Sequence, residues 1–133
     1  MTPRQVMLVQ TTFERVRPIR EAAAALFYQR LFELDPALRK LFQRDLAEQG
    51  RMLMQTLGVA VKGLGRVSTL LPTLRELGRK HAAYGVGRRD YDTVAAALLW
   101  MLEQGLGDRF TKEVREAWCV AYAALSGAMQ EGA

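Results

Sequence analysis

The sequence contains very few of the residues that build metal and disulfide sites. Its 133 residues include one cysteine, Cys119, and one histidine, His81. A single cysteine excludes an internal disulfide framework and sites that need several thiolates, and a single histidine excludes His-pair metal sites and bis-histidine haem. The chain also lacks a Cys-x-x-Cys-His stretch, which excludes haem attached in the c-type manner.

Long uncharged runs are absent as well. The longest stretch without a charged side chain, 117–130, has 14 residues, whereas a membrane span needs roughly 18 or more. Arg4, Arg15 and Arg17 flank the short apolar run near the N-terminus, and this pattern does not resemble a secretory signal. We therefore expect a cytoplasmic protein with no membrane span.

The composition predicts one helical domain over residues 1–133. Half of the residues are apolar, which is enough to fill a single core at this length. The 19 leucines equal valine, isoleucine and threonine combined, and 18 alanines add to them, which favours helix over strand. No alternating run, internal repeat or linker is found. The expected fold class is all-α, with about seven helices.

The formal charge is +5, from 19 Lys and Arg against 14 Asp and Glu. These cations are scattered along the chain, and the densest groups, Arg79-Lys80 and Arg88-Arg89, are only pairs. This distribution favours an ordinary solvated surface, so no nucleic-acid partner is expected. A small basic DNA-binding protein remains the alternative outside the class proposed below.

Capping residues and glycines predict where the helices begin and end. Thr2 with Pro3 and Gln5 predicts a capping box, and Asp35-Pro36 predicts the start of a short helix. In chain order we expect helices from the Thr2 cap to Pro18, from about 19 to 34, from the Asp35 cap to about 41, from about 46 to Gly63, from a Ser68 cap to Gly85, from about 90 to 104, and from a Thr111 cap to about 129. Residues 43–45 are expected to form a polar connection.

His81 is predicted to face the interior, because it continues the apolar stripe of Leu70, Leu74 and Leu77 at helical spacing. A lone inward histidine is either a hydrogen-bonded core residue or the ligand of a cofactor iron. A ligating histidine normally donates its second ring N–H to an acceptor. The backbone carbonyl of Leu77, one turn earlier, is the acceptor that we expect.

Two more polar side chains are predicted to point inward. Tyr28 lies in an apolar run, and Gln49 shares a helical stripe with Leu46 and Leu53. Such buried groups need hydrogen-bond partners, which they find either in the backbone and each other or in one shared pocket with His81. Ala24 and Gly50 are small enough to let the two helices cross closely.

Four parts of the sequence carry a family resemblance: LFYQRLF at 26–32, DPALRKLF at 35–42, GRKH at 78–81 with YGV at 84–86, and AW at 117–118 with AY at 121–122. In these stretches the chain resembles the globin family, and specifically the bacterial single-domain globins related to the haem domain of flavohaemoglobins. The resemblance runs over nearly the whole chain. It implies a globin fold around non-covalent haem b and its iron.

The resemblance also implies a role for individual residues. His81 would be the proximal iron ligand and Phe42 would pack on the haem face. The distal side would carry Tyr28 and Gln49 as donors to the bound gas, with Leu53 as an apolar wall. The remaining haem contacts would come from Leu77 and Lys80, and Lys80 or Arg51 would pair with the propionates unless both are ordinary surface charges. With no second histidine, the ferrous form is expected to be five-coordinate.

The function implied is tight, reversible binding of dioxygen for storage, scavenging or transport, with no catalytic residue assigned. The alternative is nitric oxide dioxygenase activity with a separate reductase, because the chain ends at Ala133 without reductase domains; a sensor is a third class. Tyr91 stands ten residues after His81, where flavohaemoglobin-like proteins carry a proximal tyrosine. Their proximal glutamate is not matched, since its position falls on Ala133 and Glu131 lies two residues short.

Overall fold

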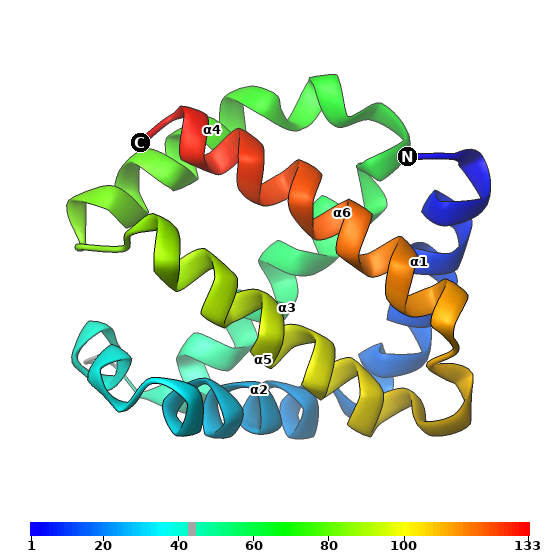
Figure 1. Cartoon of the computed structure of the whole chain (residues 1–133), viewed down its shortest axis with the longest axis horizontal. Coiled ribbons are helices and arrows are strands. Elements are labelled where there is room, and N and C mark those ends of the chain that lie inside the picture. The colour runs from blue at the N-terminus through cyan, green and yellow to red at the C-terminus, as the bar shows by residue number, and fades with distance from the viewer. Residues whose placement is uncertain (43–44) are drawn as a thin grey trace.

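The computed structural model of the chain describes residues 1–42 and 45–133, and in that part it contains six α-helices, four short 3-10 helices and no strand (Figure 1). The elements are α1 (Pro3–Val16), η1 (Arg17–Ile19), α2 (Arg20–Leu34), η2 (Pro36–Leu41), α3 (Leu46–Lys62), η3 (Leu64–Arg66), α4 (Val67–Ala83), α5 (Arg88–Leu106), η4 (Gly107–Arg109) and α6 (Lys112–Glu131). The predicted all-helical fold is confirmed. Of the predicted polar connection, residues 43 and 44 lie outside the described residues.

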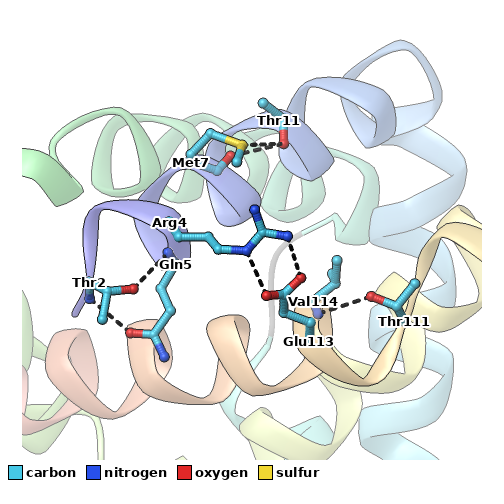
Figure 2. A network of polar contacts seen from close by, with 8 residues as sticks. All are labelled: Thr2, Arg4, Gln5, Met7, Thr11, Thr111, Glu113 and Val114. Carbon is cyan, nitrogen blue, oxygen red and sulfur yellow. Dashed lines mark hydrogen bonds and ion pairs between the residues drawn. The ribbon is translucent and has the colours of Figure 1, made fainter.

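Three of the predicted helix caps are present. The Thr2 hydroxyl accepts from the Gln5 N–H at 3.1 Å while Gln5 Oε1 accepts from the Thr2 N–H at 2.9 Å, which closes the capping box shown in Figure 2. The Asp35 carboxylate accepts from the Ala37 N–H at 3.1 Å, and the Thr111 hydroxyl accepts from the Val114 N–H at 3.2 Å. Each cap satisfies an amide that the first helical turn leaves unpaired.

One predicted cap is wrong, and one helix begins two residues before its predicted start. Ser68 is not a cap, because α4 begins at Val67 directly after η3 and Ser68 lies exposed within its first turn. The helix expected from about residue 90 begins at Arg88, because Asp90 is its third residue and its carboxylate accepts from the Gly87 N–H at 2.8 Å. Asp90 therefore stabilises the start of α5 from inside the helix.

The helices form two groups that share one core. In the first group α2 packs against both α3 and α5; in the second α6 packs against α1 and α4. Figure 1 shows α2 along one edge of the molecule and α4 along the opposite edge, with α3 between them along the chain. Thus α3 has its main contacts with α2, and α4 has its main contacts with α6.

The first and last helices are joined at two places. Arg4 forms a bidentate ion pair with Glu113 at 2.6 and 2.7 Å, on the surface between α1 and the first turn of α6 (Figure 2). Deeper in the molecule, the Trp118 indole N–H donates to the Thr12 hydroxyl at 2.9 Å.

Further along α6, Cys119 carries an exposed free thiol. No helix in the described part of the chain is long and apolar enough to traverse a lipid bilayer.

The most buried face of α3 differs from the predicted one. Of the predicted stripe, Val61 is buried and Leu46, Gln49, Leu53 and Leu57 are only half-buried. Gly50, Met54 and Ala60, which lie outside that stripe, are buried as well. The reason is that α3 turns Gly50 toward Ala24 of α2. The predicted stripe lies beside this contact, and most of its apolar side chains remain partly exposed.

Candidate functional site

Tyr28 lies at the centre of a cluster of aromatic rings on α2 and η2. Its side chain is 5% exposed, and its ring stacks on Phe32 and meets Phe42 edge to face, with centroids 6.0 and 5.3 Å away. Phe32 and Phe42 also contact each other, and the Arg39 guanidinium lies over the Phe32 ring. The structure therefore brings together Tyr28 and Phe42, two of the residues that the sequence assigns to the site.

The Tyr28 hydroxyl is a donor without a partner among the residues that the structure describes. Burial raises the pKa of Tyr28 to about 12. The phenol therefore keeps its proton at neutral pH and can donate a hydrogen bond to a molecule bound beside it. Because the rings around it leave little freedom, this donor is fixed in position.

The close helix crossing predicted from Ala24 and Gly50 is confirmed. A Cβ placed on Gly50 would lie 2.9 Å from the Cβ of Ala24 and 3.9 Å from Cε2 of Tyr28. No residue larger than glycine fits at position 50 without moving one of the helices. The crossing thereby sets the position of the N-terminal half of α3, which carries Gln49, relative to the Tyr28 ring.

Gln49 and Leu53 lie one turn apart on α3, and both are half-buried. The side-chain amide of Gln49 makes no hydrogen bond within the described ranges, so, like the Tyr28 hydroxyl, it is not engaged by that part of the protein. Leu46 and Leu57 extend the same half-buried stripe. This face of α3 would lose more of its solvent contact if an apolar molecule lay against it.

His81 lies in the last turns of α4, where Gly85 ends the helix with a φ of 96° and the Val86 N–H donates to the His81 carbonyl at 2.9 Å. The side chain is half-buried, and burial lowers the pKa of His81 below its ordinary value of 6.5. The imidazole is therefore neutral at physiological pH, which is the form that can bind a metal.

The predicted bond from His81 to the carbonyl of Leu77 is absent from this structure. The Nδ1 atom of His81 is buried and has no hydrogen-bond partner in the described part of the chain. The hydroxyl of Tyr91, at the start of α5, is the second buried polar atom with this property. A buried histidine Nδ1 or tyrosine hydroxyl normally has a hydrogen-bond partner. The two unpartnered groups therefore indicate a role other than packing in the core.

A contact that the sequence does not reveal holds Tyr91 in place. The Tyr122 hydroxyl donates to the backbone carbonyl of Tyr91 at 2.6 Å and so ties α6 to the first turn of α5. Phe32 is also missing from the predicted site, although its position four residues after Tyr28 on the same helix is a signal that could have indicated their contact.

The two candidate partners of the propionates lie at the surface. Lys80 and Arg51 are both exposed. Arg51 lies at a pocket of about 450 Å³ between α2 and α3, together with Arg20 and Tyr28. The glutamate nearest to the unmatched proximal position, Glu131, forms a surface ion pair with Arg75 at 3.3 Å. It is therefore engaged away from His81.

Comparison with known proteins defines the class. A family model for globins matches residues 25–129, a range that includes Tyr28, Gln49 and His81. The chain belongs to the globin family. It is similar to the neuroglobin of Danio rerio, with 32% identity over 94% of this chain and 87% of the relative. It is also similar to neuroglobin-1 of Oncorhynchus mykiss, with 29% identity over 99% of this chain and 92% of that relative. The neuroglobin of Chaenocephalus aceratus is 30% identical over 94% of this chain and 87% of the relative.

Globins are haem proteins that bind dioxygen, and the residues of this chain fit a haem group. His81 offers a neutral imidazole whose Nδ1 has no hydrogen-bond partner among the described residues. On α3, Leu53 and its neighbours present a half-buried apolar face. The Tyr28 donor lies against Phe42. An apolar, iron-bearing ring needs this combination of one basic nitrogen, apolar walls and one polar donor.

Proposed function

We propose that the chain holds non-covalent haem b through His81 and binds dioxygen reversibly and tightly, with Tyr28 and Gln49 as donors to the gas. The observation that carries this proposal is Tyr28, whose ring is buried among aromatic side chains and whose protonated hydroxyl makes no hydrogen bond to the described residues. This hydroxyl is therefore available to donate a hydrogen bond to a molecule that binds beside the Tyr28 ring.

The haem iron supplies the position at which a diatomic gas binds. The protein supplies the rest. His81 provides the neutral ring nitrogen, while Phe42, Leu53 and Leu77 provide apolar contacts that exclude water. With haem bound, Tyr28 O–H and Gln49 N–H would donate to the gas, and each charge-assisted bond of roughly 1.5–3 kcal/mol would lower the dissociation constant by about ten- to a hundredfold. Such affinity suits storage, scavenging or transport with slow release.

The first experiment is haem reconstitution. The purified chain is titrated with haemin and reduced, and we expect a Soret band with the spectrum of a five-coordinate ferrous haem. The His81→Gly variant should lose that spectrum and regain it on addition of free imidazole, which replaces the missing ligand. A chain that takes up no haem, or a strong six-coordinate ferrous spectrum in the wild type, contradicts the proposal.

A second function, nitric oxide dioxygenase activity, is favoured by one observation on Tyr91, which stands at the position of the proximal tyrosine in flavohaemoglobin-like proteins. Its buried hydroxyl has no hydrogen-bond partner in residues 1–42 and 45–133. The ion pair between Glu131 and Arg75 argues against the full proximal network of those proteins. The dioxygenase reaction would need an electron donor, so we infer a separate reductase. Sustained nitric oxide consumption with a reductase present, against one stoichiometric burst without it, separates enzyme from carrier.

The kinship with flavohaemoglobin haem domains is itself part of this proposal. It rests on Tyr28, Gln49 and Tyr91, and the relatives described above support the globin family as a whole. Location in the cytoplasm and pairing of Lys80 with a haem propionate are proposed on the same footing. Exposure of Lys80, three residues after Leu77 in the last turns of α4, agrees with a role at the rim of the site.

A further inference from the structure

The helix that carries His81 meets α6 backbone to backbone. A Cβ placed on Gly78 would overlap the carbonyl group of Met129 and lie 2.8 Å from its Cα. At the other side of the same crossing, a Cβ on Gly132 would overlap the carbonyl group of Arg75 and lie 2.6 Å from its Cα. The two glycines therefore make reciprocal contacts, one from each element, and neither position has room for a side chain.

These contacts fix α4 more firmly than side-chain packing does. Side chains change rotamer to absorb a shift, whereas two backbones in direct contact cannot, and a glycine Cα beside a carbonyl oxygen adds a weak C–H···O interaction. The ion pair between Arg75 and Glu131 spans the same crossing at 3.3 Å. Since α6 is the main packing partner of α4, this crossing determines how far α4 can move.

His81 lies one turn beyond this contact. It follows Gly78 by three residues on the same helix, which is about 4.5 Å along the axis. A rigid helix transmits a displacement at Gly78 to His81 without loss over such a distance. The position of the imidazole is thus tied to the backbone of the last turn of α6.

We propose that Gly78 and Gly132 are positioning residues that set the depth and tilt of His81, and hence the strain in its bond to the haem iron. This inference rests on the proposed role of His81 as iron ligand. An added methyl group at either glycine would push α4 away from α6 and carry His81 with it. If the glycines served only to pack the helices, their replacement would lower stability and leave the geometry of the ligand unchanged.

The test uses the reconstituted full chain with Gly78→Ala and Gly132→Ala. The matched control is Gly127→Ala, also on α6, where an added Cβ meets nothing within 4 Å. Resonance Raman spectra of the ferrous form report the iron–histidine stretching band. We expect this band to shift in both positioning variants and to stay in place in the control. Haem loss to an acceptor apoprotein should be about tenfold faster in the two positioning variants, which corresponds to a fall of about 1.4 kcal/mol in the activation free energy of haem release.

The outcomes separate the two proposals. A wild-type chain that takes up no haem overturns the proposed function and this inference with it. A wild-type chain that shows the band, with no shift in either positioning variant or an equal shift in Gly127→Ala, overturns the positioning role alone. Should Gly78→Ala fail to fold, Gly132→Ala decides, because residue 132 follows the last helical residue of α6 and has a φ of −83°, which alanine adopts freely.

Discussion

The ring of Phe42 meets the ring of Tyr28 edge to face, with 5.3 Å between their centroids. This contact joins the end of η2 to the middle of α2, and it depends on the Tyr28 ring and not on its hydroxyl. Packing and hydrogen bonding at Tyr28 are therefore separable by a single substitution. The site can be changed chemically while the aromatic cluster stays in place.

Tyr28→Phe should leave the fold intact and release dioxygen faster. The loss of one charge-assisted bond of roughly 1.5–3 kcal/mol predicts a dissociation rate about ten- to a hundredfold higher, measured by stopped-flow displacement. Tyr84→Phe is the control, because this tyrosine is 71% exposed at the end of α4 and should leave the rate unchanged. An unaltered rate in Tyr28→Phe would refute the donor role.

Gly50→Ala should destabilise the chain, because its Cβ would lie 2.9 Å from the Cβ of Ala24, an atom that cannot rotate away. Overpacking of this kind costs typically about 1–3 kcal/mol. The double variant Ala24→Gly, Gly50→Ala removes the opposing methyl group and should recover much of the loss. Urea unfolding of the four members of this cycle measures the coupling; strict additivity would show that the two residues do not limit the crossing.

Thr12→Val should cost about 1–3 kcal/mol of unfolding free energy, because it preserves shape but leaves the buried Trp118 N–H without its acceptor. Thr11→Val is a neighbouring control on the same helix. The Thr11 hydroxyl is exposed and donates only locally, to the Met7 carbonyl at 2.8 Å, so its loss should change stability by less than about 0.5 kcal/mol. Equal effects of the two variants would mean that the bond between α1 and α6 adds nothing.

Alkaline pH should weaken the haem-free fold through Tyr28. Burial raises the pKa of this phenol from 10.0 to about 12, so between these values the unfolded chain has lost the proton and the folded chain still holds it. The contribution of the Tyr28 phenol to the free energy of unfolding is therefore fully present below pH 10 and is lost as the pH rises toward 12. Unfolding free energies of wild type and Tyr28→Phe should show a steeper decline in the wild type across this window; parallel curves would contradict the assignment.

Local signals in the sequence predicted the ends of several helices well. The caps at Thr2, Asp35 and Thr111 are each formed with residues two or three positions away, so the pattern and the contact lie in the same short segment. The predicted cap at Ser68 is wrong because it depends on a neighbouring element and not on its own short segment alone. Whether it caps α4 depends on η3, which places the preceding residues in a helical turn and moves the helix start to Val67.

Packing between distant segments could be predicted only in part. The small residues Ala24 and Gly50 correctly indicated a close crossing, but two adjacent stripes of α3 are apolar and the sequence does not say which one faces α2. The crossing buries Gly50 and Met54 and leaves the stripe of Gln49 and Leu53 half-exposed. Similarly, a helical register suggests Leu77 as the partner of His81, whereas the orientation of the ring depends on neighbours from other elements.

The exposed thiol of Cys119 on α6 makes the chain suited to labelling at a single position. Because the sequence holds no other cysteine, a maleimide dye would attach only there, without any engineered substitution. A dye whose emission overlaps the haem absorption would dim as the prosthetic group enters. Uptake and loss of that group could then be followed by fluorescence at nanomolar protein, for the native chain and for every variant described above.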